Sequence, residues 1–355
     1  MKTAPAAAPA GGPFWTGELE YRLPPELVAQ VPAHRRDASR LMVLDGATGT
    51  TAHASFADLG RHLPAGALLV ANDSRVIRAR LRGVKRGSGG AVEALLLGAG
   101  SRTVAPAMIR VAKPLRAGQH VDFGAGVSAC IVGEPALGRA SLDFAPLSVD
   151  DALARCGELP LPPYIERAEG PSDADLERYQ TVYARSPGSV AAPTAGLHFT
   201  KELIDELASA GFDLAKITLH VGPGTFSPVR GSLSVHRMEE ERYSIDEQTA
   251  ARIARAKEEG RPVVAVGTTT VRALESAAQA DGVVRAGSAS SGLFIRPGHR
   301  FRAIDALVTN FHLPGSTLLA LVMALAGRDC IERAYEAAVA ERYHFYSYGD
   351  AMLIR

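Results

Sequence analysis

From Gly188 to the carboxyl terminus, helix-like and strand-like segments alternate along the chain, and this pattern restricts its fold more than any other feature. Residues that cap helices stand at the expected starts, at Thr200, Asp246 and Ser316, and Gly211 is placed to end the first helix. Short apolar segments between the helices predict strands: DLAKITLHV, PVVAV and AIDALVT. Strands that alternate with helices predict a mostly parallel sheet covered by helices.

A different pattern occupies the part from about Val76 to Leu147. Short strand-like segments follow one another here, separated by turns that contain glycine or proline, and they predict a small antiparallel barrel. We therefore expect an α/β fold, a mostly parallel sheet with flanking helices, formed by residues 16–72 and 150–355. The small antiparallel β-barrel is expected as an insertion at residues 73–149, after a disordered tail at residues 1–15.

The composition excludes several classes of protein. Hydrophobic residues make up 46% and charged residues 22% of the chain, which is typical of a soluble globular protein. Cys130, Cys156 and Cys330 are widely spaced and odd in number, which argues against a disulfide framework or a structural zinc site. The longest apolar run, Leu318–Ala326, is too short to cross a bilayer. We expect a cytoplasmic chain with no membrane association, no metal and no obligate protein partner.

Three loops follow predicted strands, at the positions where ligands of α/β proteins gather. They are GTTTVRALES from Gly267, TNFHLPGST from Thr309 and TLHVGPGTF from Thr218. The first suits an anionic group such as a carboxylate, because it joins a glycine and three threonines to a helix start, but ordinary helix capping is the simpler explanation for this loop alone. In the third, Gly222 and Gly224 let the backbone approach a ligand closely, without the third glycine of a dinucleotide-binding fingerprint.

Histidines and phenylalanines lie in or beside these loops. His198, His220 and His312 show no metal-binding spacing, and each alone is more often a hydrogen-bonded structural residue. In loops the same side chains favour function, since histidine transfers protons near neutral pH. Phe199 and Phe311 suit stacking on an adenine or contact with a sulfonium cation, with a place in the hydrophobic core as the alternative.

A basic run without any acidic residue lies between Arg75 and Arg86. In an extended strand Arg78, Arg80 and Arg82 project from one face, because side chains alternate along a strand. A row of guanidinium groups can follow a phosphate backbone, and a solvated strand face explains the run equally well. The net charge of +1 gives no further indication of a nucleic-acid partner.

Taken together, the ordered motifs make the chain similar to a known family. Besides the three loops, the matching blocks are YRLPPELVAQVP, LLVANDSRVIRARL, LPLPPYI, RYQTVYA, GSVAAPTAGLHFT and FYSYGDAMLI, which span Tyr21 to Arg355. This set resembles the S-adenosylmethionine:tRNA ribosyltransferase-isomerase family of queuosine biosynthesis. The resemblance implies an α/β domain with a β-barrel insertion, S-adenosylmethionine as co-substrate, and no metal.

The resemblance also implies the reaction. The ribosyl portion of S-adenosylmethionine moves onto the aminomethyl group of a 7-deazaguanine at the wobble position, in the anticodon stem-loop of tRNA. The implied product is epoxyqueuosine, and adenine and methionine are released.

Such a reaction requires a base for an acidified C5′ hydrogen, groups that hold the co-substrate and a surface for RNA. We expect the base to be His198 or His312, with His220 in reserve. The residues expected to bind S-adenosylmethionine are Asp73, Thr194, Phe199, Gly222, Gly224, Thr268, Thr269, Asn310 and Phe311. The residues expected to bind tRNA are Arg75, Arg78, Arg80, Arg82, Arg296 and Arg300.

Four positions differ from the usual pattern of this family. Glu239 stands where a second histidine is common, and Arg78 stands where proline is usual. Pro223 and Ser227 replace a leucine and an arginine. Since Glu239 and Ser227 each remove a cation near the expected site, a paralogue that transfers ribose to another acceptor remains an alternative. An alternative from another class is a non-catalytic RNA- or nucleotide-binding protein on the same fold.

Overall fold

A computed structural model describes residues 19–226 and 236–355 of the chain. The chain divides into two compact units. The α/β unit contains residues up to 73, 181–184 and those from 193 onward, and the barrel unit contains residues 74–180 and 185–192. The tail predicted at residues 1–15 lies outside the described residues.

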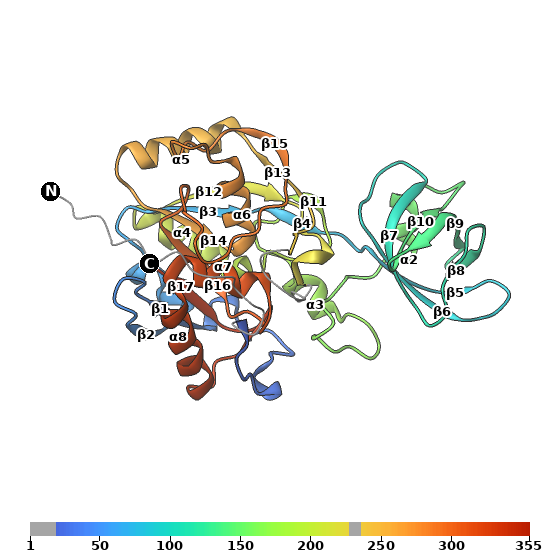
Figure 1. Cartoon of the computed structure of the whole chain (residues 1–355), viewed down its shortest axis with the longest axis horizontal. Coiled ribbons are helices and arrows are strands. Elements are labelled where there is room, and N and C mark those ends of the chain that lie inside the picture. Colours follow the sequence, from blue (N-terminus) through green and yellow to red (C-terminus); the bar gives the residue numbers. More distant parts are fainter. Residues whose placement is uncertain (1–18, 227–235) are drawn as a thin grey trace. The chain divides into compact units, whose positions relative to one another are not determined.

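The described part of the α/β unit holds a nine-stranded sheet (Figure 1). In spatial order its strands are β15 (Gly287–Ser291), β13 (Glu241–Ile245), β12 (Asp213–Leu219), β3 (Leu68–Asn72), β14 (Val263–Val266), β16 (Ala306–Asn310), β17 (Ala351–Ile354), β1 (Arg40–Leu44) and β2 (Thr51–Ser55). The central strands β12, β3, β14 and β16 are parallel to one another, and antiparallel pairs lie toward both edges. The predicted fold class is confirmed.

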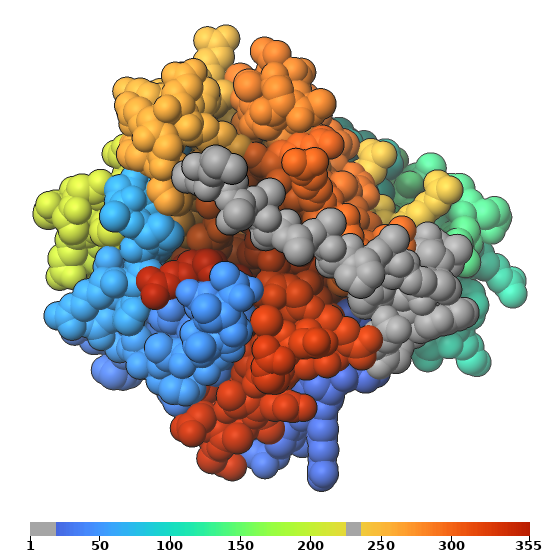
Figure 2. Space-filling view, turned by 60° about the vertical axis from the view of Figure 1, so that its left-hand side comes forward, coloured from blue at the N-terminus to red at the C-terminus, as the bar shows by residue number. Residues whose placement is uncertain are grey.

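Strands from the two ends of the chain pair within this sheet. Leu41 of β1 lies opposite Ala351 of β17 in parallel register, and in Figure 1 these strands are blue and red neighbours. Figure 2 shows the blue amino-terminal part and the red carboxyl-terminal part side by side on one face. All four residues of β17 are buried, so this strand is part of the core.

Six α-helices accompany the sheet in the described part of the α/β unit: α1 (Leu59–His62), α4 (Lys201–Ser209), α5 (Glu247–Glu258), α6 (Thr268–Ala277), α7 (Thr317–Ala326) and α8 (Arg328–Ala340). The predicted caps are confirmed, because the side chains of Thr200, Asp246 and Ser316 accept backbone N–H groups in the first turns of α4, α5 and α7. Leu203 and Leu207 of α4 pack with alternate strand residues in one buried cluster.

The barrel unit is built around a closed six-stranded barrel. Its strands in spatial order are β10 (Arg139–Asp143), β7 (Val104–Val111), β6 (Ala91–Leu96), β5 (Arg80–Lys85), β8 (His120–Gly124) and β9 (Val127–Ala136). Around it lie β4 (Ser74–Val76), α2 (Val149–Cys156), α3 (Asp173–Arg178) and β11 (Ser186–Ser189). The barrel is antiparallel throughout and encloses its own apolar core, as the short strands predicted.

The boundaries of the barrel unit differ from the predicted insertion at residues 73–149. Val149, Ala152 and Leu153 of α2 are buried in the barrel core, so the chain stays with the barrel beyond residue 149. A backbone pair between Arg80 and Glu158 and the parallel pairing of β4 with β11 add further segments to this unit. Local strand signals end before these contacts are made, which explains the shorter prediction.

Candidate active site

The four parallel strands of the α/β unit end at the same edge of the sheet, because Val266 of β14 pairs with both Ala71 of β3 and Val308 of β16. The residues that follow these strands therefore lie at one edge, where α/β proteins bind ligands. They include Asp73 after β3, His220 after β12, Thr268 after β14 and the segment after Asn310 of β16.

Asn72, which sequence reasoning did not select, connects three of these strand ends. Its side-chain NH₂ donates to the Leu219 carbonyl at 2.9 Å and to the Thr269 hydroxyl at 3.4 Å. Its side-chain oxygen accepts the Leu219 N–H at 2.9 Å. Asn72 is completely buried, so it fixes the ends of β3 and β12 against the first turn of α6.

The loop before α6 has a geometry that only glycine adopts without strain. Gly267 has a φ of +90°, and its N–H donates to the Val308 carbonyl at 2.8 Å. A side chain there would also meet Ala195, which directly follows Thr194. This geometry places Thr268 and Thr269 in the first turn of α6, both almost completely buried.

His198 makes hydrogen bonds with both nitrogens of its ring. The Asn310 NH₂ donates to the Tyr346 carbonyl at 3.0 Å, which fixes the amide orientation, and the same group donates to His198 Nε2 at 3.1 Å. The proton is therefore on Nδ1, which donates to the Ser39 hydroxyl at 2.7 Å. The ring is buried and stacks on Phe56. This arrangement suits a positioning role better than the predicted role of base, which stays untested.

The surroundings of His312 also suit the predicted role of base poorly, and that role stays untested. Burial lowers the pKa of its imidazole from 6.5 to about 3, so the ring is neutral at physiological pH. Its Nε2 pairs with the Thr309 hydroxyl at 2.8 Å, and its backbone N–H donates to the Tyr335 hydroxyl at 3.0 Å. These contacts are those of a structural histidine at the end of β16.

The phenylalanines expected to stack on the co-substrate lie in the core. Phe311 has no exposed surface, and its ring centre lies 5.1 Å from that of Phe345 and 5.4 Å from that of Tyr335. Phe199 is 1% exposed and packs edge-to-face on Phe56. Both rings therefore lie in the core, the alternative that the sequence left open, and the predicted stacking role stays untested.

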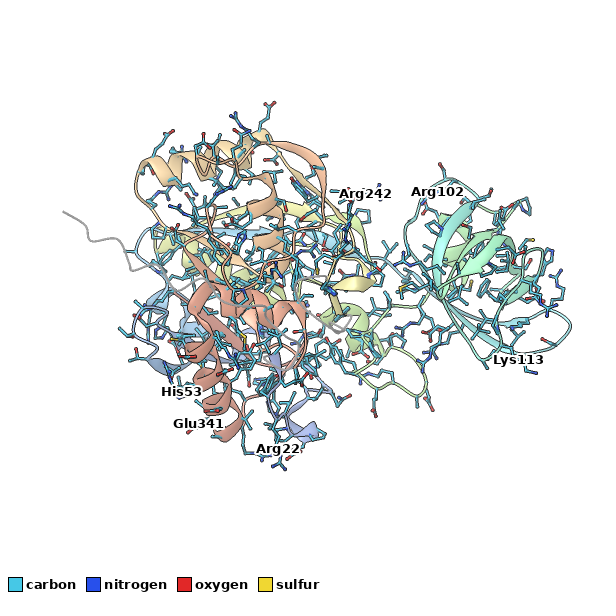
Figure 3. The ribbon with its side chains drawn as sticks, viewed as in Figure 1. Arg22, His53, Arg102, Lys113, Arg242 and Glu341 are labelled. Carbon is cyan, nitrogen blue, oxygen red and sulfur yellow. The ribbon has the colours of Figure 1, made fainter. Side chains whose placement is uncertain are left out.

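His220 is only half-buried, and its surroundings are polar. Its Nδ1 is buried and accepts or donates no hydrogen bond within the described residues. Burial lowers the pKa of the imidazole below 6.5, the neighbouring Arg242 cation lowers it further, and the Asp73 carboxylate opposes both effects. Figure 3 shows Arg242 on the α/β unit, where β13 leaves it exposed. The neutral ring at the end of β12 therefore has an unused nitrogen beside a carboxylate.

Asp73 is buried at the end of β3. Its Oδ1 accepts the Thr218 hydroxyl at 2.6 Å, and its backbone N–H donates to the Ile217 carbonyl at 2.8 Å. The two bonds hold the carboxylate against β12, where Thr218 lies two residues before His220.

The glycine loop after His220 is fixed by a buried ion pair. Glu241 Oε1 accepts the Gly222 N–H at 2.8 Å, and its other oxygen pairs with Arg272 of α6. Arg272 also donates to the carbonyls of Ser291 and Leu293, at 3.2 Å each. Both charged side chains are 3% exposed, so the pair joins β13, α6 and the glycine loop within the interior. Nothing in the local sequence indicated this pairing.

Further along the loop, the departures from the family pattern lie close together. Pro223 and Gly224 belong to a short 3-10 helix, Pro223–Phe226. A side chain at Gly224 would lie 3.0 Å from the side chain of Glu239, so the two positions are in close contact. Ser227 lies outside the described residues.

Comparison with known proteins decides the family. Residues 16–354 match the family described as queuosine biosynthesis protein. The chain belongs to this family. Proteins named S-adenosylmethionine:tRNA ribosyltransferase-isomerase from Anaeromyxobacter sp. (strain Fw109-5) and Geobacter metallireducens are 52% and 50% identical to it, over 95% of the chain and 98% of each relative. The resemblance seen in the sequence is confirmed.

A crystal structure from the same family supports the fold. The S-adenosylmethionine tRNA ribosyltransferase from Thermotoga maritima is 35% identical, with a TM-score of 0.54, and the match covers 95% of this chain and 100% of that one.

The arginines of this chain that are predicted to bind RNA differ in their surroundings. In the barrel unit, Arg80 Nε lies 3.8 Å from Glu93, and Arg82 Nε lies 3.2 Å from Glu158. The expected row of three unbalanced cations is therefore wrong, since Arg78 precedes the strand and the other two have acidic partners. In the α/β unit, Arg300 is exposed and Arg296 is half-buried. The segment that follows them is held by Glu275 of α6, whose carboxylate accepts the N–H groups of residues 302 and 303.

Among residues 19–226 and 236–355, no group of histidine, cysteine, aspartate or glutamate side chains is arranged to hold a metal ion. Within the same residues, no helix has the length and apolar character needed to span a membrane.

Proposed function

We propose that this chain transfers and isomerises the ribosyl portion of S-adenosylmethionine onto the aminomethyl group of 7-aminomethyl-7-deazaguanine at the wobble position of tRNA. The product is epoxyqueuosine, and adenine and methionine are released. The observation that carries this proposal is the match to relatives bearing that enzyme name over almost the whole length of both chains. Since tRNA is its acceptor, we place the protein in the cytoplasm.

The first chemical demand is removal of a C5′ hydrogen that the adjacent sulfonium acidifies. We assign this step to His220. Its Nδ1 has no hydrogen-bond partner among the described residues, and the pKa below 6.5 keeps the ring neutral at physiological pH. In the tautomer that carries its proton on Nε2, Nδ1 can accept the C5′ hydrogen. Once the ring has taken the proton, the neighbouring Asp73 carboxylate stabilises the imidazolium. The electron pair left at C5′ is then available for the isomerisation that expels adenine.

The second demand is to hold the co-substrate in register with His220. Thr268 and Thr269 stand in the first turn of α6, where backbone N–H groups and hydroxyls suit the methionine carboxylate. Gly222 lets the backbone approach the ligand, and Glu241 fixes its position. The buried Asn310 Oδ1, which has no hydrogen-bond partner among the described residues, suits an N–H donor such as the adenine amino group. Thr194, Asp73 and Gly224 complete the proposed set.

In this proposal His198 does not contact the co-substrate but positions Asn310. It fixes the amide of Asn310 by accepting one of its N–H groups, while Ser39 fixes the tautomer of the ring. Loss of His198 should weaken co-substrate binding, whereas loss of His220 should slow the chemical step.

The RNA substrate presents its wobble base in a single-stranded loop, from which the base can be turned into a protein pocket. Arg300 and Arg296 in the α/β unit, and Arg75 and Arg78 in the barrel unit, supply cations for the phosphates. The paired Arg80 and Arg82 contribute less, because Glu93 and Glu158 already balance their charge.

The decisive experiment incubates the protein with S-adenosylmethionine and an anticodon stem-loop that carries the aminomethyl-deazaguanine. Free adenine is followed by chromatography and the modified nucleoside by mass spectrometry. His220→Gln should lower turnover by about 10²–10⁴-fold with co-substrate affinity retained. His198→Gln, the matched control, should change affinity more than turnover.

Two results would contradict the proposed reaction, and a third would contradict only the assigned base. Adenine release without RNA modification would point to a different acceptor, the alternative raised by Glu239. Binding without adenine release would favour a non-catalytic RNA-binding protein. Normal turnover by His220→Gln would remove the base assigned here while leaving the overall reaction intact.

A further inference from the structure

Most cations of the basic run in the barrel unit already have partners. Arg80 and Arg82 lie beside glutamates, and Arg86 pairs with Asp122 at 2.6 Å. Lys85 is buried and donates to the backbone carbonyls of residues 113 and 114. Figure 3 shows Lys113 on this unit. These four cations need no outside anion.

Arg75 and Arg78 are different. Both are exposed, and within the described residues neither lies within ion-pair distance of a carboxylate. Both line one pocket of about 370 Å³ in the barrel unit. The acid in its wall, Asp150, accepts the Gly100 N–H at 2.8 Å. The two cations therefore face a pocket in which no anion is close enough to balance them.

The rest of the pocket wall is fixed and partly apolar. The Gln180 side chain accepts the Val76 N–H at 3.0 Å and donates to the Val76 carbonyl at 2.8 Å, which locks the strand between the two arginines. Ile77, Leu176 and Pro187 contribute apolar surface, since the first two are only partly buried and Pro187 is exposed. The volume falls in the range of about 300–1,000 Å³ typical of pockets that enclose small organic ligands.

A ligand that fits this wall has an anionic group for the arginines and a flat apolar group for Ile77, Leu176 and Pro187. A nucleotide meets both requirements, whereas a free inorganic anion uses only the first. We propose that this pocket binds one nucleotide of the RNA substrate, with its phosphate between Arg75 and Arg78 and its base against the apolar wall. The inference rests on the proposed function, in which RNA is the acceptor.

The test measures binding of a fluorescently labelled anticodon stem-loop RNA to the full chain at a series of KCl concentrations. Arg75→Ala and Arg78→Ala should each reduce the slope of log affinity against log salt, and the double variant should reduce it by about 0.7, the value for one phosphate contact in a single strand. Arg116→Ala is the matched control, because Arg116 is an exposed arginine of the same unit outside the pocket wall.

A second variant fills the pocket while it leaves the charges of Arg75 and Arg78 in place. Ala154 is an exposed residue of α2 in the pocket wall, so Ala154→Trp fills the pocket without disturbing the barrel core. It should weaken RNA binding on the order of tenfold, comparable to the loss of one stacked base, with an unchanged salt slope.

The inference is overturned by unchanged slopes in both arginine variants, by an equal reduction in Arg116→Ala, or by full affinity in Ala154→Trp. Wild-type protein that modifies the RNA while these variants bind normally contradicts this pocket alone. Wild-type protein that binds no RNA contradicts the proposed function as well.

Discussion

Replacing Glu241 with alanine should destabilise the α/β unit far more than an ordinary charge deletion. The change leaves the Arg272 guanidinium buried without its carboxylate, and it removes the acceptor of the Gly222 N–H. Both side chains of the pair are 3% exposed, so solvent cannot replace the lost partner. Breaking a buried ion pair from one side costs about 3–5 kcal/mol, and we expect a loss of this size in the free energy of unfolding.

Urea unfolding followed by far-ultraviolet circular dichroism measures the effect. The control is Glu332→Ala, which breaks an ion pair between Arg328 and Glu332 of α8 whose side chains are 40% and 38% exposed. Such a surface pair contributes about 0.3–0.5 kcal/mol. The double variant Glu241→Gln with Arg272→Met should recover much of the loss, because it removes both charges together.

Hydrogen exchange adds a local measurement, since the Gly222 amide should lose protection in Glu241→Ala. A loss of less than about 1 kcal/mol, or one equal to that of Glu332→Ala, would refute the reasoning that burial makes this pair critical. An unchanged Gly222 amide would show that the glycine loop is held by something other than Glu241.

Three further predictions use the same unit. A base must be neutral, and the pKa of His220 is lowered below 6.5, so the acid limb of the pH–rate profile should lie below pH 6.5. Arg242→Ala should move this limb to higher pH, because the Arg242 cation lowers the pKa. An acid limb that stays in place in Arg242→Ala would show that it does not report on His220. Below pH 6.5 the unfolded His312 binds a proton that the folded ring, with a pKa of about 3, does not, so stability falls as the pH falls. Between pH 7 and pH 5, His312→Gln should therefore lose about 2 kcal/mol less in urea unfolding than wild type, and equal losses would contradict the assigned burial. Gly196→Ala should cost about 1–3 kcal/mol, because its side chain would collide with the Tyr183 hydroxyl and approach Thr181 to 2.7 Å, whereas Gly46→Ala, whose nearest contact is 3.5 Å, should be nearly neutral in thermal unfolding.

Features set by neighbouring residues could be predicted from the sequence. Thr200, Asp246 and Ser316 cap helices through a backbone N–H three residues further on. A cap of this kind depends only on local geometry, so the residue type and the following apolar pattern are sufficient. The same holds for the short strands of the barrel, whose turns lie between adjacent segments.

The electrostatics of the basic run could not be predicted in this way. No acidic residue occurs between Arg75 and Arg86, yet Arg82 lies opposite Glu93 in the paired strand and close to Glu158 of a later segment. Strand pairing brings charges together that are distant in the sequence, and the register of the barrel decides which arginines remain unbalanced. Only the structure separates Arg75 and Arg78 from the rest.

The ranking of the histidines depends on contacts of the same long-range kind. The sequence favours His198 or His312 as the base, but the ring partners of His198, Ser39 and Asn310, are 159 and 112 residues away. They occupy both nitrogens, and burial alone makes His312 a poor proton acceptor. Of these three histidines, all within the described residues, only His220 combines a half-buried ring, an unused nitrogen and a neighbouring carboxylate, since β12 ends where Asp73 leaves β3. A general base needs a ring nitrogen that makes no other hydrogen bond. Contacts between residues distant in the sequence decide which nitrogen is left in this state, so a sequence motif does not reveal it.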